Sequence, residues 1–195
     1  MSNDFVFYVK LGLEHVLDFA AYDHILFLTA LALPFTFKRW KAVLLLATIF
    51  TIAHCTSLAL SAYEVLQINS AIIEFFIPVT IALTALYNLY LVFINREQTN
   101  IYFHAISTAF FGLIHGFGFS NYFNMMMAEE TEKLLPLLGF ASGIEIAQVL
   151  IVLAVLLLAF VLQDLIAIKQ RLFIAVLSFL IVLITIPMLI DTFPS

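Results

Sequence analysis

The sequence has few charged residues and almost no cysteine. Only 11% of its 195 residues are charged, whereas 64% are hydrophobic. A soluble domain is closer to a quarter charged and half apolar, so this composition predicts an integral membrane protein. The one cysteine, Cys55, excludes an intramolecular disulfide and a thiolate-rich metal site. No stripe of basic residues is present, so we expect no nucleic-acid partner.

Signal-peptide, repeat and low-complexity patterns are also missing. Residues 1–10 have no basic stretch followed by an apolar core and a small-residue cleavage site, so we expect no cleavable signal peptide. No internal repeat or low-complexity segment stands out. We therefore expect one transmembrane domain over residues 1–195, without a separate soluble domain.

Six apolar segments are long enough to cross a bilayer core of about 30 Å as helices. They lie near 18–37, 42–63, 71–94, 102–123, 135–161 and 172–190. A continuous helix from Phe5 to Phe37 would exceed thirty residues, so we predict a break near Asp18 to Ala21. The predicted fold is an all-α, polytopic membrane helix bundle with six transmembrane helices and a short N-terminal interfacial helix.

Basic residues in the loops predict the orientation. The first, third and fifth loops hold six of the eight: Lys38, Arg39, Lys41, Arg96, Lys169 and Arg171. Lys10 and Lys133 lie at the opposite ends. We therefore predict a multi-pass protein of the bacterial inner membrane, with both termini outside. The acidic loop Glu129, Glu130 and Glu132 would then face outward.

Ionisable residues gather in residues 14–27 and recur in later spans. Within fourteen residues lie Glu14, His15, Asp18, Asp23 and His24, in a chain with five histidines altogether. Each ionisable group costs about 2.5–3.5 kcal/mol at a helix centre in the membrane. Such groups are paired, hydrated or bound to a cation, and we favour the cation.

Five predicted spans each carry one possible metal ligand at a similar depth in the outer half. These residues are His24, His54, Glu74, His115 and Glu145. Glu74 also suits a helix-start acid near the surface, and Asp23 suits a carboxylate that orients the His24 imidazole. His104, near the inner end, is more typical of a packing residue.

Four motifs in order resemble the HupE/UreJ family of bacterial membrane proteins over nearly the whole chain. They are His15 with DHILF at 23–27, FTIAH at 50–54, FGLIHGFGF at 111–119 and GIEIAQ at 143–148. The resemblance implies a nickel or cobalt permease connected with hydrogenase and urease maturation. It also implies that the polar motif positions are His15, Asp23, His24, His54, His115 and Glu145.

The first motif departs from the family pattern, which usually reads H-x5-D-H. Here the spacing from His15 to Asp23 gives H-x7-D-H. On a continuous helix, His15 and His24 would point about 180° apart. Either the chain breaks between them, as predicted, or His15 leaves the site.

The ligand set indicates a divalent transition metal. Three imidazoles with carboxylates suit Zn²⁺, Ni²⁺ or Co²⁺, and they are too nitrogen-rich for Mg²⁺ or Ca²⁺. The first hypothesis is a metal permease, with release inward past Asn88, Thr108 and His104.

Two alternatives stay open at this point. One is a zinc-dependent intramembrane hydrolase or protease with Glu145 or Glu74 as general base, acting on a lipid, lipoprotein or membrane-anchored substrate. The other is a metal sensor or insertase-like partner without turnover. The bilayer and the metal ion are the expected partners, and the oligomeric state is not readable from the sequence.

Overall fold

The computed structural model describes residues 2–95, 100–128, 130 and 132–194, and within them the chain is helical without any strand. This confirms the predicted all-α fold. The elements are α1 (Ser2–Leu17), α2 (Asp23–Ala32), η1 (Phe37–Arg39), α3 (Trp40–Ala62), α4 (Ser70–Phe93), α5 (Ile101–Met126), α6 (Leu134–Phe160), η2 (Val161–Leu165) and α7 (Gln170–Asp191).

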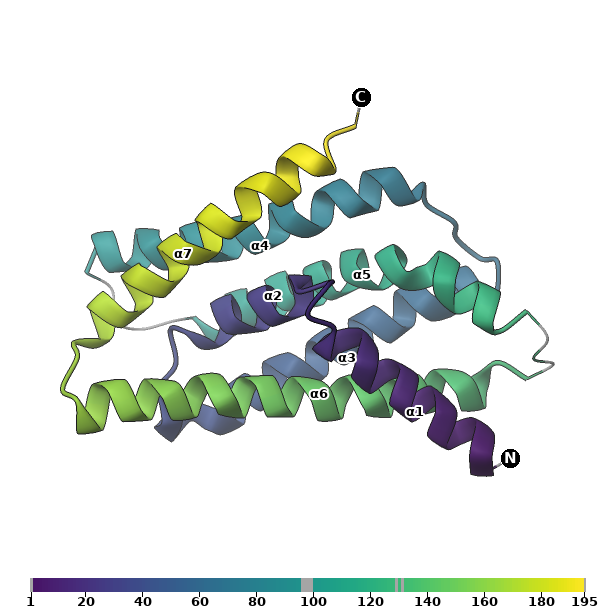
Figure 1. Cartoon of the computed structure of the whole chain (residues 1–195), viewed down its shortest axis with the longest axis horizontal. Coiled ribbons are helices and arrows are strands. Elements are labelled where there is room, and N and C mark those ends of the chain that lie inside the picture. The colour runs from purple at the N-terminus through teal and green to yellow at the C-terminus, as the bar shows by residue number, and fades with distance from the viewer. Residues whose placement is uncertain (1, 96–99, 129, 131, 195) are drawn as a thin grey trace.

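Five helices are long and apolar enough to cross a membrane, and they correspond to five of the six predicted spans. They cover Phe37–Ala62, Ser70–Phe93, Ile101–Met126, Leu134–Leu165 and Gln170–Asp191. In Figure 1 they run along the long axis of the molecule, with their loops at its two ends. The chain is therefore a multi-pass membrane protein.

The segment predicted as the first span, 18–37, differs from the prediction. It contains only α2, whose 10 residues extend over roughly 15 Å and cannot cross a bilayer alone. The predicted short N-terminal helix is present as α1, and Figure 1 shows α1 starting near one end of the bundle and α2 continuing toward the opposite end. The first crossing is thus divided into two helices, with residues 18–22 between them.

Proline and a buried amide explain where α2 ends. The carbonyl of Ala30 would normally accept from residue 34, but Pro34 has no N–H. Asn88 of α4 donates its Nδ2 to that carbonyl at 2.7 Å. This bond satisfies a backbone group that has no water available at membrane depth.

Glycines allow two helix pairs to approach closely, because a residue without a side chain lets two backbones come near each other. A Cβ at Gly143 of α6 would lie 2.0 Å from the Val9 carbonyl oxygen of α1, and one at Gly12 would lie 2.2 Å from the Phe140 carbonyl oxygen. Between α5 and α3, a Cβ at Gly116 would lie 2.2 Å from the His54 carbonyl oxygen. Backbone contact at these glycines sets how near α1 and α3 lie to the bundle centre.

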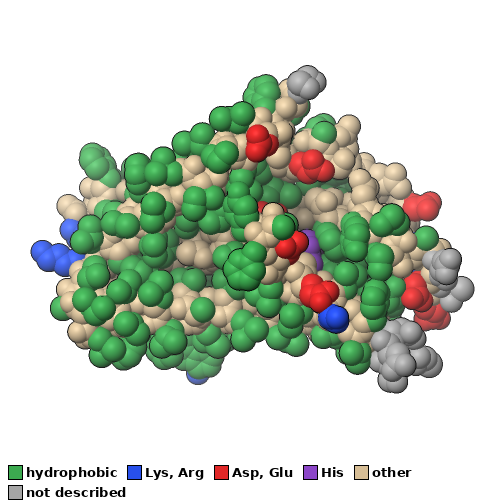
Figure 2. All heavy atoms as spheres, in the orientation of Figure 1, with side chains coloured by type: hydrophobic (Ala, Val, Ile, Leu, Met, Phe, Trp, Pro, Cys, Tyr) green, Lys and Arg blue, Asp and Glu red, His purple; other side chains and the backbone are tan. Residues whose placement is uncertain are grey.

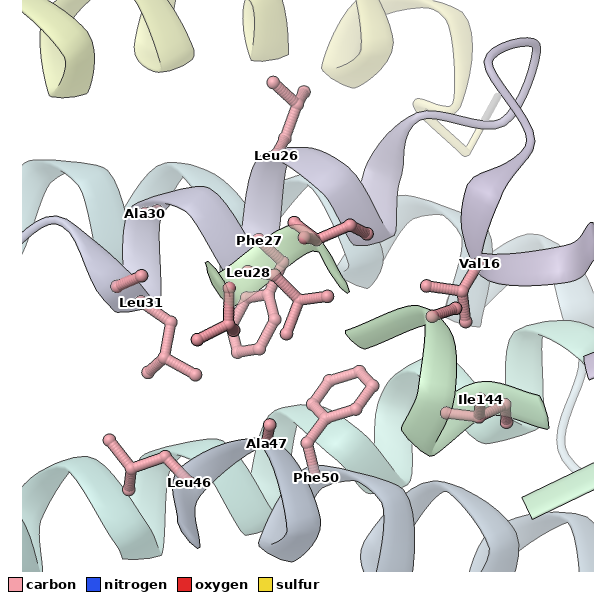
Figure 3. Packing of buried hydrophobic residues seen from close by; sticks show 14 of the residues in the cluster. Val16, Leu26, Phe27, Leu28, Ala30, Leu31, Leu46, Ala47, Phe50 and Ile144 are labelled. Carbon is pink, nitrogen blue, oxygen red and sulfur yellow. The ribbon is translucent and has the colours of Figure 1, made fainter. Parts of the chain in front are cut away.

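The apolar core lies where α2 meets α3 and α6. Phe27 and Phe50 are fully buried, and their rings stack with centroids 5.0 Å apart. Figure 3 shows these two rings facing one another, with Leu28 beside them and Val16 and Ile144 nearby. These side chains pack together in the core between α1, α2, α3 and α6.

The surface seen in Figure 2 is mostly hydrophobic, as expected for a lipid-facing protein. Most of its Lys and Arg side chains lie at the left end, and the Asp and Glu side chains lie over the right half. We call these the basic end and the acidic end. The loops after α3 and α5 belong to the acidic end, and those after α2, α4 and α6 belong to the basic end.

Candidate metal centre

Three histidines from three helices converge beside the break in the first crossing. His15 lies in the last turn of α1, His24 lies in the first turn of α2 and His54 lies in the second half of α3. One possible ligand atom from each lies within 4.8 Å of the other two. We call these three residues the histidine cluster, and it is the one group of three or more possible metal ligands found among the described residues.

The break between α1 and α2 is what allows His15 and His24 to meet. Their ring centroids are 4.6 Å apart, although they would point in opposite directions on one continuous helix. The helix stops at Leu17 and restarts at Asp23. In the connecting turn, Asp18 Oδ1 accepts from the Ala20 amide at 2.8 Å. The predicted break is therefore confirmed, and His15 stays beside His24.

Asp23 determines which His24 nitrogen faces the cluster. Its Oδ1 lies 3.0 Å from His24 Nδ1 and also accepts from the His24 amide at 2.8 Å. Because a carboxylate oxygen accepts, Nδ1 carries the proton and Nε2 keeps a free lone pair. This is how carboxylates orient metal-binding imidazoles, and it matches the role expected for Asp23.

His115 of α5 adds a fourth imidazole next to the cluster. Its ring centroid lies 5.3 Å from that of His24. His115 Nδ1 donates to the Phe111 carbonyl oxygen at 2.9 Å, so Nε2 again keeps its lone pair. His115 lies outside the group of three, so the geometry makes it an adjacent ligand candidate.

The nitrogens that face this centre have no protein partner. Nε2 of His15, His24 and His115 and both ring nitrogens of His54 are buried without a hydrogen bond within the described part of the chain. Each unsatisfied buried group costs about 1–3 kcal/mol. Because the lone pairs of His24 and His115 are free, the missing partner is a Lewis acid or a hydrogen-bond donor.

The residues present fit a transition-metal ion. Metal–nitrogen bonds of about 2.0–2.1 Å limit two nitrogens on one ion to about 4.2 Å apart. The histidine cluster, with its limit of 4.8 Å, needs only sub-ångström contraction to reach that spacing. Neutral imidazoles are ligands for Zn²⁺, Ni²⁺ and Co²⁺, so the chemistry of the donor set agrees with the sequence prediction.

Aromatic rings enclose the cluster on several sides. The Phe119 ring lies 3.8 Å from that of His15, and the Phe50 ring lies 5.2 Å from that of His115. Phe140 stacks on Phe119 at 5.2 Å. An apolar surround of this kind limits water access and strengthens metal–ligand electrostatics. Only His15 among these histidines is partly exposed, and Figure 2 shows histidine beside acidic side chains on this face.

Glu145 lies in a separate polar group between α3 and α6. Its two carboxylate oxygens accept from Thr48 Oγ1 at 2.6 Å and Thr51 Oγ1 at 2.5 Å. Gln148 donates to Thr51 Oγ1 at 2.9 Å. Glu145 is therefore bound to hydroxyls and is not a member of the histidine cluster. Thr48 was missed in the sequence, although it lies one turn before Thr51 on the same helix face.

The remaining predicted residues lie away from the cluster. Glu74 is exposed in the second turn of α4, so it lies just beyond the first turn that the helix-start reading expected. His104 is buried near the start of α5, next to the Phe35 ring at 5.6 Å. Neither Glu145 nor Glu74 therefore provides the general base that a hydrolase needs beside the metal, and that alternative is not supported. In the acidic loop, Glu129 lies outside the described residues, and Glu130 accepts from Tyr8 at 3.1 Å.

Comparison with known proteins identifies the family. A family model described as "HupE / UreJ protein" matches residues 1–191, which is nearly the whole chain. No curated protein and no solved structure matches the chain. The family match covers the histidine cluster, His115 and the polar group around Glu145. The chain belongs to the HupE/UreJ family.

Proposed function

We propose that this chain is a permease for a divalent transition-metal ion, with Ni²⁺ or Co²⁺ as cargo. The observation that carries the proposal is the set of buried imidazole nitrogens that converge without partners. The family, which is associated with nickel and cobalt, favours these two ions over Zn²⁺. The ligand chemistry alone accepts all three.

The divided first crossing supports transport. Membrane transporters commonly build their ion sites where a helix is broken, because the irregular backbone can line a cavity. Here the break at 18–22 adjoins two of the three clustered histidines. The exposed Asp18 and the partly buried Asp23 add negative charge beside this break, which raises the local cation concentration there.

A polar route toward the basic end supports the same function. Thr51 lies one helical turn from His54, and Gln148 and Glu145 of α6 join it through hydrogen bonds. The carboxylate and amide oxygens offer harder ligands than the imidazoles, so an ion would be held less tightly there. We therefore propose inward passage along α3 and α6.

The route first expected, past Asn88, Thr108 and His104, has less support. The Asn88 amide is bonded to the Ala30 carbonyl. Phe27 and Phe111 line the same cavity as Thr108 and His104, and the Phe27 ring also lies 5.4 Å from that of His115. An ion would meet aromatic carbon along that direction.

The direct test is metal uptake into proteoliposomes together with elemental analysis of the purified protein. We expect near-stoichiometric Ni²⁺ or Co²⁺ in the wild type, and loss of both metal and uptake in His54→Ala. His104→Ala is the matched control, since it removes a buried histidine outside the cluster and should keep the metal. Bound metal without uptake above empty vesicles would contradict transport. Equal metal content in His54→Ala and wild type would contradict the site.

A further inference from the structure

A cavity lies between α4 and α5, nearer the basic end and apart from the histidine cluster. Its volume is about 440 Å³, and its lining comes from α2, α4 and α5. Leu83 and Phe103 line it and are about half exposed, at 52% and 49%. Both side chains belong to the hydrophobic surface, so a molecule would enter this cavity from the bilayer.

Two buried polar atoms of the cavity wall have no hydrogen-bond partner among the described residues. His104 and Thr108 are 4% and 1% exposed, and neither His104 Nε2 nor Thr108 Oγ1 has a hydrogen bond within the described chain. They are four residues apart on α5, so they lie on the same helix face. By contrast, the Thr84 hydroxyl in the same wall donates to the Thr80 carbonyl at 2.8 Å. A ligand with a hydrogen-bonding group would supply a partner for His104 Nε2 or Thr108 Oγ1.

Aromatic rings and leucine side chains make up most of the rest of the wall. The Tyr87 and Phe103 rings lie 5.0 Å apart, and the Tyr87 ring lies 5.8 Å from that of His104. Aromatic faces favour a planar guest, which stacks with little loss of conformational freedom. One imidazole and a hydroxyl are too few ligands for a dehydrated cation. The chemistry of this cavity therefore differs from that of the metal centre.

We propose that the α4–α5 cavity binds a membrane-soluble molecule with a planar, carbonyl-bearing ring, that is, a lipid of the quinone class. Its ring lies among Tyr87, Phe103 and Phe111. A ring carbonyl accepts a hydrogen bond from Thr108 Oγ1 or from His104, and the apolar tail leaves between α4 and α5 into the bilayer. This binding is independent of the proposed transport function.

The test is equilibrium binding of decylubiquinone to the full chain in detergent, with bound quinone extracted and quantified by chromatography. We expect saturable binding of about one equivalent in the wild type. Thr108→Val keeps the side-chain shape and removes the hydroxyl, and it should weaken binding about tenfold, the loss expected for one hydrogen bond. Thr185→Val, in α7 and away from the cavity, is the matched control and should bind as the wild type does.

Two further measurements separate the quinone from a simple acyl chain. Leu83→Trp fills the exposed mouth of the cavity and should abolish binding, while its circular-dichroism spectrum and thermal unfolding report that the protein is folded. Decylbenzene, which has the tail and a ring without carbonyls, should not compete with decylubiquinone. Non-saturable binding, wild-type affinity in both Thr108→Val and Leu83→Trp, or equal competition by decylbenzene would overturn the proposal.

Discussion

At the residue scale, the orientation of single imidazoles decides what this centre can bind. Asp23 and the Phe111 carbonyl each accept from a histidine Nδ1, which leaves two Nε2 lone pairs free. His54 contributes a ring whose two nitrogens have no hydrogen-bond partner among the described residues. The residue types were visible in the sequence, but their tautomers depend on hydrogen bonds that only neighbouring atoms determine.

Asp23→Asn should weaken metal binding without removing it. The amide keeps the size of the carboxylate but loses its charge, so the His24 imidazole is less basic and less firmly oriented. Loss of such a partner typically costs about 10–100-fold in metal affinity. Competition with a chelator of known affinity measures the change. Asp164→Asn, in η2, is the control, and unchanged affinity in Asp23→Asn would contradict the orienting role.

Glu145→Gln should separate binding from transport. Because the Glu145 carboxylate accepts from two threonines and is outside the histidine cluster, the variant should retain the metal of the purified protein. Loss of the negative charge along the proposed route should raise the free-energy barrier to passage of the ion by about 1.4 kcal/mol or more. Such an increase lowers the uptake rate about tenfold. Loss of the bound metal in Glu145→Gln would instead make Glu145 a ligand, as first expected from the sequence.

At the element scale, close helix packing brings the candidate ligands near one another. α1 rests on α6 through Gly12 and Gly143, which brings His15 inward, and α3 rests on α5 at Gly116, directly against the His54 backbone. The sequence predicted a full-length span after the break near Asp18 to Ala21, whereas α2 has only 10 residues. Hydropathy reports how apolar a segment is and does not report whether its backbone stays helical.

Gly116→Ala should destabilise the protein and disturb the metal centre. The added Cβ would lie 2.0 Å from Ser57 Oγ and 2.2 Å from the His54 carbonyl oxygen, so α3 and α5 must separate. Overpacking of this kind costs about 1–3 kcal/mol. Thermal unfolding in detergent and metal content measure both effects. Gly118→Ala is the control, because its nearest contact is the flexible end of Ile77; an equal loss in both variants would argue against a specific effect at His54.

At the scale of the whole molecule, charge is divided between the two ends of the bundle. Lys38, Lys41 and Lys169 belong to the basic end, and Glu64 and Glu132 belong to the acidic end. The histidine cluster is reached from the break in the first crossing, and the α4–α5 cavity lies nearer the basic end. The proposed metal site and the proposed lipid-ligand site therefore lie in different halves of the bundle.

Accessible-cysteine labelling should show the acidic end outside the cell. In a Cys55→Ser background, Glu132→Cys should react with a membrane-impermeant maleimide on intact cells. Lys38→Cys should react only after the membrane is permeabilised, because basic loops are retained in the cytoplasm. The reverse pattern would place the termini inside and would reverse the proposed direction of entry.

The sequence by itself determined the membrane class, five of the spans, the family motifs and the ligand types, because composition and hydrophobic periodicity are local properties of the chain. Only the tertiary structure decided which polar residues meet. It brought His15 to His24 across a broken helix, and it bound Glu145 to Thr48 and Thr51. It also left His104 facing an aromatic cavity. Such contacts join residues far apart in sequence, and depth along a helix does not fix the direction in which a side chain points.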